Sequence, residues 1–221
     1  MPSPDGPDGP VRLLIVDDHE LLAGTLAVVL RQRGLEVHTA NGPTPDAVVR
    51  AARELEPALV LLDLDLGPGM GCGLDLVHPL SEVGTRVVMM TGIQDRARLG
   101  ACVEAGAVGI VSKTAAFDEL VDTVERAAHG ETVMAEPERT ALLDAVAAQR
   151  RADAGRVGRF ATLSPRERSV LAGLVAGESP EAIARRSYVS LATVRSHIRS
   201  ILLKLGVRSQ LAAVAMARAA G

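Results

Sequence analysis

The sequence predicts a doubly wound α/β domain followed by a small all-α helix-turn-helix domain. Two observations predict the first domain: short apolar runs alternate with segments of helical periodicity, and the runs end at polar residues. One observation predicts the second domain, since three capped helical segments follow one another closely near the C-terminus. A chain of 221 residues is long enough for two domains of these sizes.

The elements of the first domain follow from apolar patterning. Residues 1–10 are turn-formers without periodicity, and we expect them to be disordered. The expected strands are Val11–Val16, Leu35–Thr39, Ala58–Leu62, Arg86–Met90 and Val108–Ser112. The expected helices are Leu21–Leu30, Asp46–Leu55, a segment ending at Gly106, and Ala115–His129. This alternation implies a parallel sheet of flavodoxin-like strand order, whose ligand site lies beyond the carboxyl ends of the strands.

Polar residues stand where that rule places a site. Five of them end or directly follow an expected strand, namely Asp17, Asp18, Asp63, Thr91 and Lys113. Three carboxylates at one sheet edge repel one another unless a cation joins them, and their oxygen ligands suit Mg²⁺. A lysine and a hydroxyl nearby would suit a phosphoryl group carried on one carboxylate. The sequence contains no glycine-rich phosphate loop, so a nucleotide site is not indicated.

With these residues in these places, Val11–Gly130 resembles a CheY-like receiver domain. The resemblance implies that Asp63 is phosphorylated, that Thr91 is the switch hydroxyl and that Lys113 binds the phosphate. It also implies Mg²⁺ ligands, namely Asp17, Asp18, Asp63 and the backbone carbonyl of Asp65. A sensor histidine kinase is the implied phosphoryl donor.

Asp65 competes with Asp63 for the role of acceptor. The Gly73-Leu74 pair stands at the distance from Asp65 that such a pair normally keeps from the acceptor. We prefer Asp63, because choosing Asp65 would place Asp63 inside a buried strand. Two features depart from the receiver pattern: Ile110 replaces the usual coupling aromatic, and the loop GPGMGCG after the acceptor is longer and richer in glycine.

The C-terminal segment carries the helix signals of the second domain. Ser164-Pro165-Arg166-Glu167 combines an N-cap, a proline in the first turn and the glutamate of a capping box. Ser179-Pro180 opens a second helix, and Ser190 and Gly206 bound a third. In a helix-turn-helix the last of these helices enters the major groove of DNA. Arg195 and Arg199 are one turn apart, so both can reach the duplex from one side.

Leu163–Met216 resembles the DNA-binding domain of LuxR/NarL-type transcription factors. The stretches LSPRERSVLAGLVAGES and EAIARRSYVSLATVRSHIRSILLKLGV carry this resemblance. The resemblance implies that double-stranded DNA is contacted by Thr193, Arg195, Ser196, Arg199 and Lys204. It also implies a homodimer formed through a last helix at roughly Ser209–Ala220. Pro180, Glu181 and Ala182 depart from the family, which usually has polar and basic residues there.

Charge is divided between the two halves of the chain. Residues 161–221 hold 9 basic and 3 acidic residues, whereas residues 1–160 hold 15 basic and 24 acidic residues. We therefore expect only the C-terminal domain to touch nucleic acid. The chain has no signal peptide and no apolar run of membrane-spanning length, so we expect a cytoplasmic protein without a membrane partner.

The expected organisation is a disordered segment at 1–10, a receiver at 11–130, a linker at 131–160 and a DNA-binding domain at 161–221. Within the linker, Glu136–Arg151 is expected to be helical and Ala152–Gly158 to be a flexible hinge. The leading hypothesis is a transcription factor switched by phosphorylation. The alternative is a constitutive or ligand-responsive regulator whose receiver is a dimerisation scaffold, which Ile110 and the altered loop favour. An enzyme is not expected, because it would leave the basic domain unexplained.

Overall fold

The computed structural model describes residues 10–40, 44–67 and 69–218. The chain divides into two compact units, Met1–Ala147 and Ala148–Gly221. The expected disorder at 1–10 concerns residues that lie outside the described ranges, except for Pro10.

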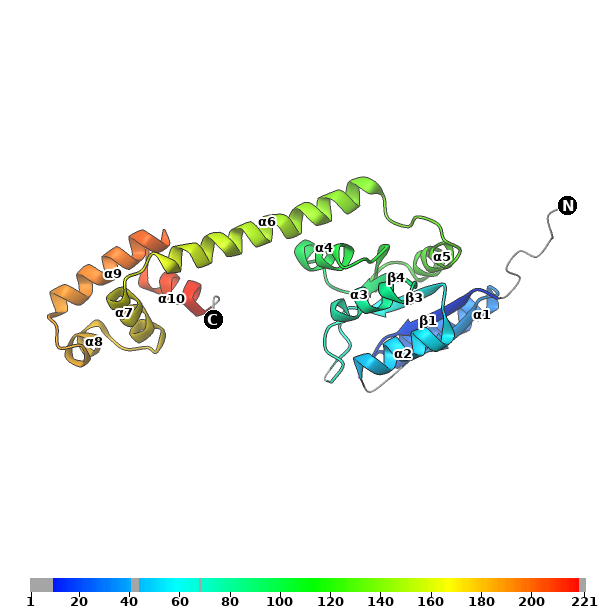
Figure 1. Cartoon of the computed structure of the whole chain (residues 1–221), viewed down its shortest axis with the longest axis horizontal. Helices are drawn as coiled ribbons and strands as arrows, with labels where there is room; N and C mark the ends of the chain where they lie inside the picture. Colours follow the sequence, from blue (N-terminus) through cyan, green and yellow to red (C-terminus); the bar gives the residue numbers. More distant parts are fainter. Residues whose placement is uncertain (1–9, 41–43, 68, 219–221) are drawn as a thin grey trace. The chain divides into compact units, whose positions relative to one another are not determined.

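The first unit is built on a parallel sheet of five strands in the order β2-β1-β3-β4-β5. Three of them, β1, β3 and β4, are labelled in Figure 1. The strands are β1 (Arg12–Val16), β2 (Glu36–Thr39), β3 (Leu59–Asp63), β4 (Arg86–Thr91) and β5 (Gly109–Ser112). Nearly every residue of the inner strands β1, β3 and β4 is buried, as expected for strands covered on both faces. The predicted doubly wound, flavodoxin-like fold is confirmed.

Helices cover both faces of this sheet. They are α1 (Glu20–Gln32), α2 (Pro45–Leu55), α3 (Leu74–Glu82), α4 (Arg96–Glu104) and α5 (Phe117–Ala128). Because side chains alternate along a strand, Leu13 and Ile15 pack with α1 and α5, whereas Leu14 and Val16 pack with α2, α3 and α4. The two apolar clusters hold the strands in register, so their carboxyl ends meet at one edge.

Helix α3 was not among the helices expected from the sequence. Pro79 lies inside it, where a proline removes one backbone hydrogen bond and disfavours helix. Leu76, Val77 and Leu80 are nonetheless buried against the sheet. Tertiary burial therefore outweighs the local preference here.

Helix α6 (Glu136–Ala161) corrects the expectation of a flexible hinge, because Ala152–Gly158 is helical throughout. Gly155 and Gly158 each destabilise a helix by about 1 kcal/mol relative to alanine. The neighbouring alanines and arginines have high helix propensity and offset this cost. The first part of α6 packs within the first unit. Leu142 joins Val103 and Met134 in a small buried cluster.

The second unit is all-helical, with α7 (Pro165–Val175), α8 (Pro180–Arg186), α9 (Leu191–Leu205) and α10 (Gln210–Arg218). The expected caps are present: the side chains of Ser164, Ser179 and Ser190 accept hydrogen bonds from backbone amides, and Gly206 ends α9 with φ +70°. The last helix was expected to reach Ala220, and its described part ends at Arg218. The apolar stripe of α9 lies in the core of this unit.

Within the described residues, no single helix is long and apolar enough to cross a membrane. Helices α9 and α10 pass that test only as a pair, and they are bent by 60° where they meet. Their buried residues, such as Ile198, Ile201 and Ala213, pack in the core of the second unit.

Candidate functional site

The carboxyl ends of β1, β3 and β5 bring together side chains that are far apart in the sequence. Asp17 and Asp18 follow β1, Asp63 ends β3, and Lys113 follows β5. The ammonium Nζ of Lys113 donates hydrogen bonds to Asp63 Oδ2 at 2.6 Å and to Asp17 Oδ1 at 3.0 Å. The parallel sheet therefore gathers these predicted site residues at the expected edge.

The carboxylates of Asp63 and Asp17 are almost entirely buried, with 3% and 0% of the side chains exposed. The pKa of Asp63 is raised, and burial is the largest cause. The hydrogen bond from Lys113 lowers this pKa, whereas the negative charge of Asp17 raises it further. For Lys113, burial by itself would lower the pKa. Its hydrogen bonds to Asp63 and Asp17 outweigh that effect, so the pKa is raised. The lysine is a fixed cation beside two buried acids.

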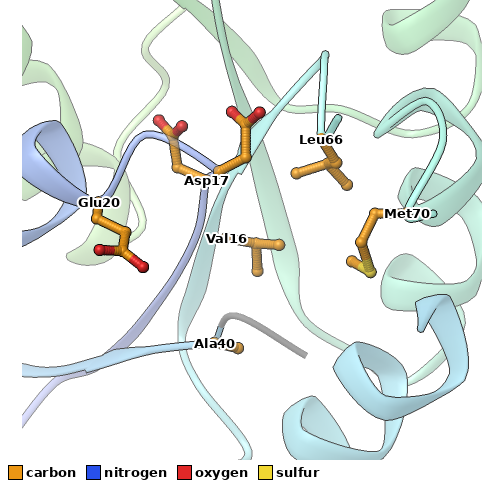
Figure 2. Close-up of a pocket in the computed structure, with 7 residues that line it drawn as sticks. Val16, Asp17, Glu20, Ala40, Leu66 and Met70 are labelled. Carbon is orange, nitrogen blue, oxygen red and sulfur yellow. The ribbon is translucent and has the colours of Figure 1, made fainter. Parts of the chain in front are cut away.

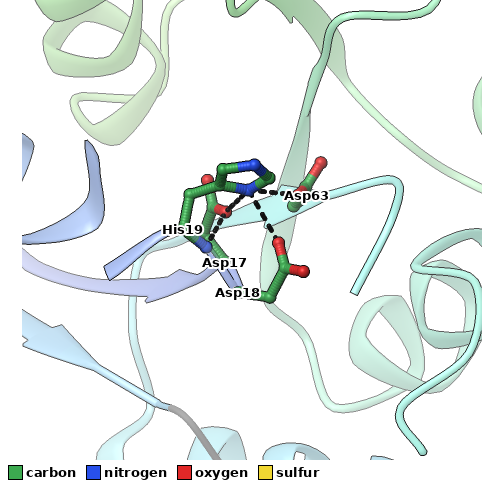
Figure 3. A group of neighbouring side chains, drawn as sticks. All are labelled: Asp17, Asp18, His19 and Asp63. Atoms are coloured by element: carbon green, nitrogen blue, oxygen red, sulfur yellow. Dashed lines mark hydrogen bonds and ion pairs between the residues drawn. The ribbon is translucent and has the colours of Figure 1, made fainter. Parts of the chain in front are cut away.

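His19 joins the three aspartates in an acidic cluster of possible metal ligands at this edge. Asp17, Asp18, His19 and Asp63 each offer one ligand atom, and these atoms lie within 4.8 Å of one another. Figure 3 shows the His19 ring turned toward the three carboxylates. Three carboxylates around one point are a donor set that hard divalent cations prefer. The residues present therefore fit a divalent cation.

A cavity of about 220 Å³ adjoins the cluster (Figure 2). Asp17, Asp18 and Glu20 form its acidic side, and Leu66 and Met70 come from the loop after β3. It is further lined by Val16 and Ala40. The glycine-rich loop that departs from the receiver pattern thus forms one wall of the site.

Two glycines let that loop approach the site closely. Gly67 has φ +73°, and a Cβ there would lie 2.9 Å from Asp18 Oδ2. A Cβ on Gly73 would lie 2.0 Å from the carbonyl oxygen of Asp63. Any larger residue at either position would have to displace one of these aspartates.

Thr91 ends the strand beside Asp63, and Asp65 follows Asp63 by two residues, but neither side chain belongs to the ion pairs described above. Thr91 ends β4, is buried, and its Oγ1 accepts a hydrogen bond from the amide of Ile93 at 3.0 Å. Asp65 is exposed, and its amide donates to Asp63 Oδ1 at 3.3 Å. Of the two competing acceptors, Asp63 is the one whose carboxylate accepts a hydrogen bond from Lys113. The suggested metal contact of the Asp65 carbonyl stays a prediction.

The expected DNA-facing residues share the exposed surface of α9. Thr193, Arg195, Ser196 and Arg199 are all exposed, while Val194 and its apolar neighbours are buried on the opposite side. Glu181 lies near this surface, with its Oε1 4.0 Å from the guanidinium of Arg195. This surface of α9 is therefore free within its own unit to meet a duplex.

The remaining expected DNA contact, Lys204, has a partner inside the second unit. Its Nζ donates to Glu167 Oε2 at 2.7 Å, and Ser200 Oγ donates to Glu167 Oε1. Lys204 is thereby tied to the start of α7. Its role at DNA stays a prediction.

Comparison with known families identifies both domains. The family of response regulator receiver domains matches residues 13–125, and the luxR family of bacterial regulatory proteins matches residues 161–217. The chain is a LuxR-family response regulator. It therefore joins a receiver to a LuxR-type DNA-binding domain and is a DNA-binding regulator of transcription.

Curated relatives of this response regulator cover nearly its whole length. The response regulator protein VraR of Staphylococcus epidermidis is 29% identical over 207 residues, spanning 92% of this chain and 94% of the relative. VraR of Staphylococcus aureus is 28% identical over the same length.

Solved structures share the fold. A LuxR-family two-component response regulator from Aurantimonas sp. SI85-9A1 is 28% identical with a TM-score of 0.50, and the match covers 64% of this chain and 99% of that chain. A complex of the response regulator RcsB with DNA has a TM-score of 0.51 at 22% identity, covering 96% of this chain and all of that one, and shows likeness of fold.

Sequence reasoning missed two residues of the response regulator. His19 follows Asp17 and Asp18 directly, and that adjacency was the signal that could have placed it in the acidic cluster. Glu167 was identified only as part of a capping box, and its second set of contacts, to α9, depends on tertiary packing. No local pattern reports a contact across 37 residues.

Proposed function

We propose that the response regulator is switched by transfer of a phosphoryl group to Asp63. The observation that carries this proposal is the position of Lys113 Nζ, 2.6 Å from Asp63 Oδ2 and 3.0 Å from Asp17 Oδ1. A lysine in that position can bind the oxygens of a phosphoryl group attached to Asp63. The proposed donor is a sensor histidine kinase.

In the proposed transfer, a carboxylate oxygen of Asp63 attacks the phosphorus of the donor. The bond between phosphorus and the leaving group breaks as the bond to Asp63 forms, and the leaving group takes the electron pair. Lys113 holds the phosphoryl oxygens, and Asp17 orients Lys113 through their hydrogen bond. Asp63 is therefore the nucleophile and Lys113 the phosphate-binding residue.

We propose Asp17, Asp18, Asp63 and the carbonyl of Asp65 as the ligands of Mg²⁺ at this site. When bound, Mg²⁺ supplies positive charge that offsets the charge of the phosphoryl group. The grouping of the acidic ligand atoms within 4.8 Å of one another supports this proposal.

Thr91 is the proposed switch hydroxyl, since it ends the strand beside Asp63. Ile110 lies on the next strand and packs against the cluster that contains Leu142 of α6. We propose that a change at Thr91 reaches α6 through the packing of Ile110. A rotating aromatic side chain is then not required at this position.

We propose that the output is binding of a homodimer to double-stranded DNA in the cytoplasm. Thr193, Arg195, Ser196 and Arg199 are the proposed contacts, supported by their exposure on one surface of α9. The proposed dimer contact is α10, where Leu211 is 79% exposed. We propose no enzymatic activity toward a separate substrate.

Incubation with Mg²⁺ and a small-molecule phosphodonor tests the central claim. Intact mass should increase by one phosphoryl group in the wild type and in Asp65→Asn, and it should not change in Asp63→Asn. The Asp65→Asn variant is the matched control, because it removes the competing acceptor two residues away. No gain in the wild type would support the phosphorylation-independent alternative, and an undiminished gain in both variants would remove the claim that Asp63 is the acceptor.

A further inference from the structure

The imidazole of His19 lies inside the acidic cluster although two thirds of its side chain is exposed. Its Nδ1 is 2.7 Å from Asp18 Oδ1, 3.2 Å from Asp17 Oδ1 and 3.9 Å from Asp63 Oδ2 (Figure 3). With 66% of the side chain exposed, burial of apolar surface does not explain this orientation. The ring is turned toward the carboxylates by polar interactions.

We propose that His19 Nδ1 is a nitrogen ligand of the cation held by Asp17, Asp18 and Asp63, and that the site consequently prefers divalent transition metal ions to Mg²⁺. This inference rests on the proposed function, because it concerns the same cation. It adds a ligand that the resemblance to receivers did not assign.

The separations fit ligands of one ion. Neighbouring ligands of an octahedral ion bound at about 2.1 Å lie about 3 Å apart, and opposite ligands about 4 Å apart. The separations from Nδ1 to the three carboxylate oxygens run from 2.7 to 3.9 Å and are close to those values. All four ligand atoms lie within 4.8 Å of one another, so side-chain movements would bring them around one ion.

The backbone holds His19 at this place. Its amide donates to Asp17 Oδ1 at 2.8 Å, and it is the residue directly before α1. Its side chain makes no capping hydrogen bond to the helix. The imidazole therefore faces the cluster and does not serve the start of α1, and its Nδ1 also lies 3.3 Å from Lys113 Nζ, which would have to move aside when an ion binds.

The chemical consequence is selectivity. Mg²⁺ prefers oxygen ligands and keeps several waters, so a nitrogen ligand adds little to its affinity. Transition metal ions gain from imidazole, and their affinity for mixed nitrogen and oxygen sites rises along the first row. A site with three carboxylates and one imidazole should therefore favour Mn²⁺ and its later neighbours.

Pulsed electron paramagnetic resonance of the full-length protein with Mn²⁺ tests the ligand directly, because a bound imidazole gives a ¹⁴N coupling. We expect the coupling in the wild type and in His78→Phe, and its loss in His19→Phe. His78 is the matched control, since its side chain is 72% exposed and it lies in the same unit on α3. A coupling that persists in His19→Phe would overturn the inference.

Competition between Mn²⁺ and Mg²⁺ gives a second measurement that misfolding does not imitate. The ratio of Mn²⁺ to Mg²⁺ affinity should fall at least about tenfold in His19→Phe and stay unchanged in His78→Phe. A misfolded variant would lose both ions together. Tight Mn²⁺ binding without nitrogen coupling would overturn the inference and leave the proposed cation site standing. If neither ion binds the wild type, the inference and the proposed cation site are both overturned.

Discussion

Glu167 ties two helices of the DNA-binding domain together through one buried carboxylate. Its Oε2 accepts hydrogen bonds from the Ser164 amide and from Lys204 Nζ, each at 2.7 Å. Its side chain is 6% exposed. The hydrogen bond from Lys204 is the largest influence and, with that from Ser200, lowers the pKa of Glu167 from 4.5 to about 2. The same residue therefore caps α7 and holds the C-terminal part of α9.

This shift predicts an acid-sensitive second unit. In the unfolded chain Glu167 takes up its proton near pH 4.5, whereas in the folded protein it stays ionised down to about pH 2. Its contribution to stability is therefore complete above pH 4.5 and is lost as the pH falls toward 2. Glu167→Gln should lower stability by about 1–3 kcal/mol at pH 7. Urea unfolding of both proteins at several pH values should show the difference shrinking over that range, and a constant difference would contradict the assignment.

Lys113 offers a second test at the scale of the residue. Lys113→Met keeps the aliphatic stem but leaves the buried carboxylates of Asp63 and Asp17 without their cation. We expect a loss of about 3–5 kcal/mol in the free energy of unfolding. Adding Asp63→Asn should recover part of that loss, because it removes one of the two neighbouring negative charges. Urea unfolding of the two single variants and the double variant measures the coupling, and simple additivity would contradict the ion pair.

At the scale of the element, the start of α6 depends on a glycine in α4. A Cβ at Gly100 would lie 2.2 Å from the Leu142 carbonyl oxygen and 2.6 Å from Val146 Cγ2. Leu142 and Val146 are both buried. The close approach of these two helices within the first unit therefore requires a residue without a side chain at position 100.

Gly100→Ala should displace the start of α6 and destabilise the first unit by about 1–3 kcal/mol. Hydrogen exchange should show reduced protection of the backbone amides at 138–147. Gly24→Ala is the matched control, because Gly24 is helical and its Cβ would meet nothing within 4 Å. That control should be neutral or stabilising by up to about 1 kcal/mol. Equal protection in both variants would show that α6 does not depend on this contact.

The second prediction at the scale of the element concerns the exposed surface of α9, which is the proposed contact with DNA. Arg195→Ala or Arg199→Ala should each cost about 1–3 kcal/mol of specific DNA binding if the guanidinium groups contact base edges. Arg53→Ala, on the exposed surface of α2, should leave binding unchanged. The measurement is a titration with DNA fragments recovered by genomic pull-down. Unchanged affinity and an unchanged salt slope in both α9 variants would refute the assignment.

For the whole molecule, the expected consequence of phosphorylation is tighter DNA binding. Coupling between two sites of this kind typically changes affinity by about 5-fold to 150-fold. We expect the wild type with Mg²⁺ and phosphodonor to bind its DNA at least about fivefold more tightly and to dimerise at lower concentration. The Asp63→Asn variant should show neither change. Fluorescence anisotropy and analytical ultracentrifugation measure the two effects, and equal DNA affinity with and without phosphodonor would favour the alternative function.

Much of this protein could be predicted from local signals. Apolar runs such as that preceding Asp17 marked the strands, and the serine caps marked α7, α8 and α9, because both patterns act within a few residues. The position of Asp17, Asp63 and Lys113 at strand ends was enough to predict that they meet, since parallel strands end at one edge. Family resemblance then supplied the roles that geometry by itself does not assign.

The tertiary structure decided the features that depend on partners distant in the sequence. Pro79 lies in a helix and Ala152–Gly158 continues α6, because burial and propagation of a helix outweighed local signals for a break. Lys204 binds Glu167, and Asp63 comes within 3.9 Å of His19, only because packing brings those side chains together. The sequence by itself determined the five strands, where they end and where the capped helices begin, since those signals act within a few residues. The choice of partner for each charged side chain was made by the packing of the fold.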